Sequence, residues 1–136
     1  MSYGVSGALQ AAVFTALSAD TALTTLVGTA IYDAVPVGTV PAIYVLLGSE
    51  TVREASDVSG EGAVHTFTVS VITTNPGFTS AKAAAGAVSD ALQDAELTLS
   101  RGSLVSLRFE RAVAQRVDSA SARQIDLRFR ARVQDD

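Results

Sequence analysis

The segment from residue 124 to residue 133 alternates between polar and apolar side chains without a break, and this pattern constrains the fold more than any other. One side of the segment carries the apolar residues Ile125, Leu127, Phe129, Ala131 and Val133. The other side carries the polar residues Gln124, Asp126, Arg128, Arg130 and Arg132. Because successive side chains of a β-strand point to opposite faces, the pattern predicts a half-buried strand with an outer face rich in arginine.

A second alternating segment, residues 105–117, lies just before it. Its apolar side is expected to carry Val105, Leu107, Phe109, Val113 and Val117, with Arg111 as the one charge among them. Its other side carries Ser106, Arg108, Glu110, Ala112 and Arg116. A polar connection, residues 118–122, then predicts a terminal β-hairpin. If both apolar faces meet one core, paired residue numbers have an even sum, and a sum of 242 would place Arg116 opposite Asp126 and Glu110 opposite Arg132.

Helices are expected in three places. Apolar residues at helical spacing predict helices over residues 5–17 and 21–27, the second capped by Asp20 and ended by Gly28. A longer helix is expected from a cap at Thr79 or Ser80 to about Ala95. Its buried stripe would be Ala81, Ala84, Ala85, Val88, Ala91, Leu92 and Ala95.

Three further extended segments complete the pattern, at residues 31–33, 42–47 and 63–73. The polar segment 48–62 is expected to extend the strands on either side of it and to have a mobile tip. Helices mixed with mostly antiparallel strands predict one α+β domain over residues 1–136. We expect a single, mostly antiparallel sheet with two main helices packed on it and the hairpin at its end.

Composition excludes several kinds of chemistry. The chain has no cysteine and one histidine, His65, so thiolate nucleophiles and cysteine-based metal sites are excluded. The net charge is −4, but eight of the ten basic residues lie at or beyond Arg101, and nine of the ten are arginine. Arginine is the better residue for forked pairing with carboxylates at interfaces. No signal peptide or membrane-spanning run is expected.

Residue patterns typical of catalysis or cofactor binding are weak here. His65 lies on the apolar side of its expected strand, where a core or interface histidine is a better interpretation than a catalytic base. Glu50, Glu54 and Asp57 with Arg53 could form a carboxylate site, although a solvated loop is the better interpretation. The arginines of the last two strands could contact a protein, stay in solvent or contact nucleic acid, in that order of preference. Interleaved exposed aromatic residues, typical of single-strand binding, are not expected.

The order of the motifs resembles that of a known family. The motifs are D-x-x-L-x-x-L-V-G from Asp20, I-Y-D from Ile31, P-x-I-Y-V-x-L-G from Pro41, H-x-F-x-V-x-V from His65, and the final I-D-L-R-F-R-A-R-V. Together they resemble the tail-completion, or tail-terminator, proteins of long-tailed phages, and most of all the versions carried by alphaproteobacterial gene transfer agents. The resemblance implies a structural virion protein and no enzyme, with no catalytic residue, cofactor or metal.

The resemblance also implies partners and a location. Members form rings, usually six-fold, that cap the tail tube, stop its polymerisation and join the tail to the head. The implied partners are copies of the same chain, the tail tube protein and a head-neck connector or stopper protein, while DNA passes through the ring without sequence-specific binding and no membrane is involved. The protein would be in the host cytoplasm during assembly and then in the particle.

We hypothesise that seven charged residues make the protein contacts: Arg53, Glu54, Asp57, Arg108, Arg128, Arg130 and Arg132. An alternative interpretation is a small oligomeric α+β enzyme or ligand-binding domain with a pocket between sheet and helices. Arg111 with Gln115 is the polar pair that such a pocket would use. A nucleic-acid-binding module is a third interpretation, against which the acidic net charge argues.

Overall fold

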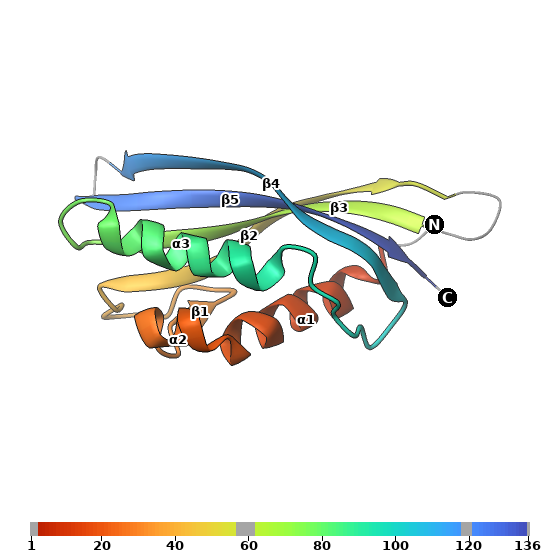
Figure 1. Cartoon of the computed structure of the whole chain (residues 1–136), viewed down its shortest axis with the longest axis horizontal. Coiled ribbons are helices and arrows are strands. Elements are labelled where there is room, and N and C mark those ends of the chain that lie inside the picture. Colours follow the sequence, from red (N-terminus) through yellow and green to blue (C-terminus); the bar gives the residue numbers. More distant parts are fainter. Residues whose placement is uncertain (1–2, 57–61, 118–120, 136) are drawn as a thin grey trace.

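The computed structural model describes residues 3–56, 62–117 and 121–135, which form two layers (Figure 1). The helices are α1 (Ser6–Ala19), α2 (Thr21–Val27) and α3 (Thr79–Leu92). The strands are β1 (Ile31–Tyr32), β2 (Ile43–Glu54), β3 (Gly62–Thr73), β4 (Ser103–Val117) and β5 (Ala122–Gln134). All three helices lie on one face of the sheet, which we call the helix side. None of the described segments covers the other face, which we call the bare face. The expected α+β class is confirmed.

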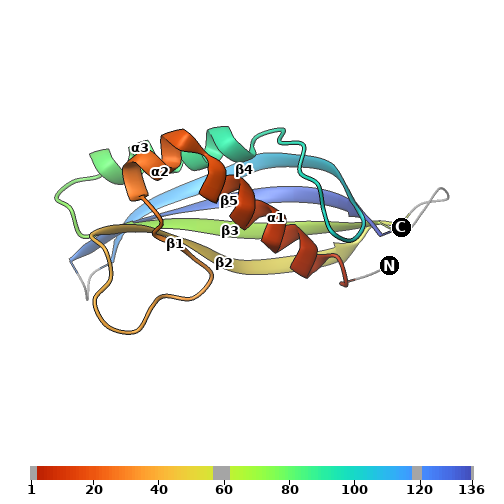
Figure 2. The same ribbon diagram turned by 90° about the horizontal axis from the view of Figure 1, so that it is seen from below.

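The five strands form one sheet in the order β1-β2-β3-β5-β4. Only β1 and β2 run parallel, through two residue pairs, and all other neighbours are antiparallel. The terminal strands β4 and β5 form the expected hairpin. Figure 2 shows that β4 lies at one edge of the sheet and that β2, with the short β1, lies at the other.

The core lies between the helices and the sheet. Phe129 in β5 is fully buried and stacks on Phe67 in β3, with 5.7 Å between the ring centroids. Alanines on α3 permit its close approach to the sheet; those of the expected stripe that are buried are Ala81, Ala84 and Ala85. Ala91 and Ala95 are only partly buried. None of the described helices is long and apolar enough to cross a membrane.

The helix ends follow the sequence in one case and depart from it in another. The Asp20 carboxylate accepts a hydrogen bond from the backbone N–H of Leu23 at 3.0 Å, so the expected cap of α2 is confirmed. The expected cap of α3 is wrong. Phe78 occupies that position with no side-chain hydrogen bond, and the Ser80 hydroxyl instead accepts from the Asn75 side chain. The helix ends at Leu92, before Ala95.

The predicted register of the terminal hairpin is wrong: Val117 pairs with Ala122 next to the turn, a sum of 239, and two β-bulges in β4 shift the sum further along the strand. Paired residue numbers sum to 238 from Ser106 to Phe109 and to 239 from Arg111 onward, rather than to 242. Each bulge adds one residue to β4, so the alternation of faces changes along it. Val113 therefore lies opposite Asp126 on the bare face of the sheet, not on the apolar side. Val105, expected on the apolar side, lies at the first bulge and is 53% exposed.

A candidate interaction surface and a buried polar cluster

Arginines gather on the face of the sheet that no described helix covers. Residues that pair across neighbouring strands share a face, and the pairings of β2, β3, β5 and β4 place six arginines together. We call this surface the arginine face; it comprises Arg53, Arg108, Arg111, Arg128, Arg130 and Arg132. It lies on the upper side of the sheet in Figure 1. The structure thus brings together five of the seven expected interface residues.

The other two expected residues do not join this surface. Glu54 pairs with Ala63, on the helix side of the sheet, and Asp57 lies outside the described residues. Arg111 also belongs to the arginine face, although the alternation of residues 105–117 predicts the apolar side for it. The second bulge of β4, between Phe109 and Arg111, turns its side chain to the bare face.

The arginine face holds like charges at close range. Arg108 lies directly opposite Arg130, and Arg111 lies directly opposite Arg128. Directly opposite side chains have Cβ atoms about 5 Å apart, so like charges there are destabilising. Glu110 relieves one site, with its Oε1 2.7 Å from Nε of Arg128. The face therefore retains an excess of positive charge on a chain whose net charge is −4.

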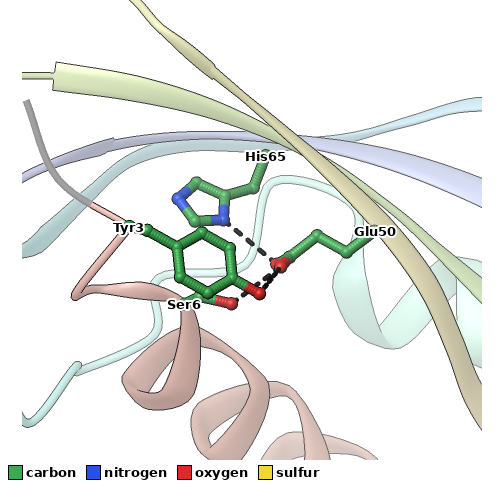
Figure 3. Close-up of polar contacts among 4 residues, drawn as sticks. All are labelled: Tyr3, Ser6, Glu50 and His65. Atoms are coloured by element: carbon green, nitrogen blue, oxygen red, sulfur yellow. Dashed lines mark hydrogen bonds and ion pairs between the residues drawn. The ribbon is translucent and has the colours of Figure 1, made fainter.

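A second polar group lies on the opposite side of the sheet, under the start of α1 (Figure 3). Oε1 of Glu50 accepts hydrogen bonds from the Ser6 hydroxyl at 2.7 Å and from the Tyr3 hydroxyl at 3.1 Å. Oε2 of Glu50 lies 3.1 Å from Nδ1 of His65. His65 is fully buried, so its interpretation as a core residue is confirmed in its placement.

A bulge in β2 explains why Glu50 reaches this site. The register shifts between Leu47 and Glu50, so that Glu50 pairs with Phe67 on the helix side. Without the extra residue, strict alternation would send Glu50 to the bare face. Gly48 within an otherwise strand-like pattern was the available sequence signal, because an isolated glycine in a strand often marks a bulge.

Burial and hydrogen bonding shift the pKa of Glu50 in opposite directions. Burial alone would raise the pKa of Glu50, whereas hydrogen bonds from His65, Ser6 and Tyr3 and the charge of His65 lower it. The net result is a pKa below the ordinary value of 4.5. Glu50 is therefore ionised at neutral pH and ties the start of α1 to β2 and β3.

The geometry of this cluster does not support nucleophilic catalysis. In a serine hydrolase, the histidine bonds to the serine hydroxyl and takes its proton. Here Ser6 and His65 both bond to Glu50, and the carboxylate lies between them. The cluster therefore holds segments together and does not activate Ser6.

The two residues expected to line a ligand pocket between the sheet and the helices do not lie there. Arg111 and Gln115 both pair with residues of the bare face, Arg128 and Gln124, and so do not point between sheet and helices. The cavity beside Leu9 and Phe67, at about 30 Å³, is itself too small for a small-molecule ligand. Among the described residues, no group of three His, Asp or Glu side chains could hold a metal ion.

Comparisons with known proteins identify the family. The chain matches the model of the family described as tail completion protein gp17 over residues 11–134. The chain belongs to the tail completion protein gp17 family. A solved structure described as the virion of a native gene transfer agent particle contains a chain with 62% sequence identity and a TM-score of 0.93. The match covers 98% of this chain and 99% of that chain. No match was found among curated proteins.

The predicted resemblance to tail-completion proteins of the gene transfer agent type is confirmed by these matches. Membership of the gp17 family makes this chain a structural tail protein and points away from an enzyme. The similarity to a component of an assembled particle supports a location in the virion and assembly with other particle proteins. In a structural tail protein, an exposed charged surface is a candidate site of contact with another particle protein.

Proposed function

We propose that this chain is the tail terminator of a gene transfer agent-like or phage-like particle. Copies of the chain would form a six-fold ring that caps the tail tube, stops its polymerisation and joins the tail to the head. DNA would pass through the ring without sequence-specific binding. The observation that carries the proposal is the 62% identity, over nearly the full length of both chains, to a chain of a gene transfer agent virion.

The arginine face is the surface that we assign to contact with another particle protein, either the tube or the head-neck stopper protein. Its like-charge pairs, Arg108 with Arg130 and Arg111 with Arg128, disfavour the isolated chain. An acidic partner surface would relieve this repulsion, because arginine pairs with carboxylates through forked hydrogen bonds. Five of the seven residues expected to make protein contacts belong to this face. We assign it to a protein because the acidic net charge of the whole molecule disfavours DNA.

The proposal also assigns a sequence of locations. The chain would be made in the host cytoplasm and would join the particle after the tube has reached its full length. Neither a cofactor nor a membrane has a role in this scheme. The position of the ring would be the top of the tail.

Electron microscopy of particles made without this gene tests the proposal directly. A tail terminator predicts overlong or irregular tails that lack heads, and complementation with the wild-type gene should restore tails of uniform length attached to heads. Normal tails on normal heads in the deletion strain would contradict the proposed function. Tails of normal length without heads would retain the joining role and contradict the role in stopping polymerisation.

A further inference from the structure

An open groove runs along the helix side of the sheet, between α3 and the edge strand β4. The groove has a volume of about 270 Å³ and is mostly apolar. Its floor is formed by the buried side chains of Ile125 and Leu127, and its walls include Gly86 on α3 and Ala112 on β4. Every residue of β4 from 108 to 116 is exposed. A long, open edge strand with apolar neighbours is a liability unless something covers it.

An exposed apolar loop lies at the opposite edge of the sheet. Residues 33–42 connect β1 to β2, and in Figure 2 this loop projects beyond the edge formed by β2. Residues 33–39 are all exposed, and Val37 has an exposed fraction of 104%. Within the described part of the chain, the backbone of residues 33–41 makes no hydrogen bond to another backbone group. Val37 is thus fully exposed to water, and Val35 is 43% exposed.

We propose that the loop of residues 33–42 of one copy of this chain occupies the α3–β4 groove of the next copy. The inference rests on the proposed function and deepens it, because it names the surfaces that close the ring. A head-to-tail ring needs two different complementary surfaces on each subunit. The loop and the groove lie at opposite edges of one sheet, an arrangement that allows a repeating head-to-tail contact.

Charge supports the same pairing and its direction. The loop carries a single charge, Asp33, at its start. One end of the groove is positive, because Lys82 lines it. Both Lys82 and Arg123 lie over the ring of Phe78: Nζ of Lys82 is 5.9 Å from the ring centroid, and Cζ of Arg123 is 5.6 Å from it. Arg116 lies directly opposite Arg123 on β4. We orient the loop so that Asp33 lies near this basic end while Val35 and Val37 occupy the apolar part of the groove.

Disulfide cross-linking tests the contact cleanly, because the chain has no native cysteine. We would make Val37→Cys with Ala112→Cys, purify particles and oxidise them mildly. The two positions lie at opposite edges of the sheet, so a disulfide between them can form only between copies. We expect a ladder of linked multimers on a non-reducing gel. The matched control, Val37→Cys with Thr68→Cys on the bare face, should give no ladder. Assembled particles of the first variant without a ladder would overturn the inference.

A substitution at Gly86 gives an independent test that does not depend on cysteine. A Cβ added at Gly86 meets nothing within 4 Å, so the monomer accepts a side chain there. Gly86→Gln would fill the groove, whereas Gly86→Ala would leave it open, and both residues are better helix formers than glycine. We expect both variants to fold, and only Gly86→Gln to lower the yield of head-attached tails, by about tenfold or more. Equal yields from the two variants would overturn the inference.

The deletion phenotype separates the two proposals. If tails are normal without the gene, the proposed function fails, and the groove contact has no ring to close. If tails are overlong without the gene but Gly86→Gln particles are normal and no ladder forms, the tail terminator stands and the loop-in-groove contact is wrong.

Discussion

Glu50 makes side-chain hydrogen bonds that join the start of α1 to the sheet. It joins Tyr3 and Ser6, at the start of the chain, to His65 on β3 through hydrogen bonds of 2.7 to 3.1 Å. Its side chain is only 19% exposed. The bulge in β2 therefore lets a single side chain connect the helix layer to the sheet.

The lowered pKa of Glu50 makes the stability of the protein depend on pH. A carboxyl group whose pKa is lower in the folded state stabilises the fold above its unfolded pKa, and this contribution is lost as the pH falls through the folded value. We therefore expect the free energy of unfolding to fall as the pH is lowered below about 4.5, the ordinary value for this group. Glu50→Gln should be less stable at pH 7 and should show a weaker fall at acid pH. Urea denaturation at a series of pH values measures both effects, and identical pH profiles would contradict the assignment.

Gly102 is a second residue with a strict requirement. Its φ is +71°, and a Cβ there would collide with the carbonyl oxygen of Gln134. We expect Gly102→Ala to lower the free energy of unfolding by about 2–4 kcal/mol, because strain and a backbone clash add together. Gly77→Ala is the matched control: Gly77 has a φ of +73° but open space around it, so it should cost about 1 kcal/mol. Equal losses for the two variants in urea denaturation would show that the clash is relieved.

At the scale of elements, regular alternation and helical spacing were sufficient to predict most of the fold. The sequence predicted the β4–β5 hairpin and the bounds of α2, because these depend on local pattern and on a cap that Asp20 supplies. It also predicted the inward faces of β3 and β5. These features need no information about distant residues.

The elements that were predicted wrongly depend on bulges and on competing partners. The bulges in β4 place Arg111 and Val113 on the face opposite to the predicted one, and the bulge in β2 brings Glu50 to the helix side; strict alternation has no means of locating bulges. Ser80 lies inside α3, which begins at Thr79, and its hydroxyl accepts a hydrogen bond from the Asn75 side chain, so it does not cap the helix. The arginine face was therefore predicted in outline from β5, while its sixth member, Arg111, required the register.

The cap of α2 supports a prediction about this element. The Asp20 carboxylate satisfies the backbone N–H of Leu23 at the start of a seven-residue helix. Leu23 is fully buried in the core, so loss of the cap should lower the stability of the whole protein. We expect Asp20→Ala to lower the free energy of unfolding by about 1 kcal/mol. Asp20→Asn keeps a capping oxygen and should cost much less; if both variants lose the same stability, the hydrogen bond has no role as a cap.

At the scale of the whole molecule, the two faces of the sheet have different uses. The helix side is occupied by the core, the Glu50 cluster and the groove along α3. The bare side is left for the arginines, which repel one another across β4 and β5. A molecule that keeps such repulsion on one open face trades stability of the isolated chain for a surface that can bind an acidic partner.

Charge reversal at Arg130 should separate the stability of the isolated chain from its binding to an acidic partner. Arg130 lies directly opposite Arg108, so Arg130→Glu replaces a like-charge pair by an opposite-charge pair. We expect the isolated protein to gain about 0.2–1 kcal/mol in its free energy of unfolding at low salt, because an attractive cross-strand pair replaces a repulsive one. The same variant should lose its place in the particle, since it would repel the acidic surface that we assign to the arginine face. Chemical denaturation measures the first effect, and electron microscopy with a gel of purified particles measures the second. Arg130→Lys keeps the charge and should still be incorporated. A variant Arg130→Glu that is more stable and also assembles normally would show that the arginine face meets no partner in the finished particle.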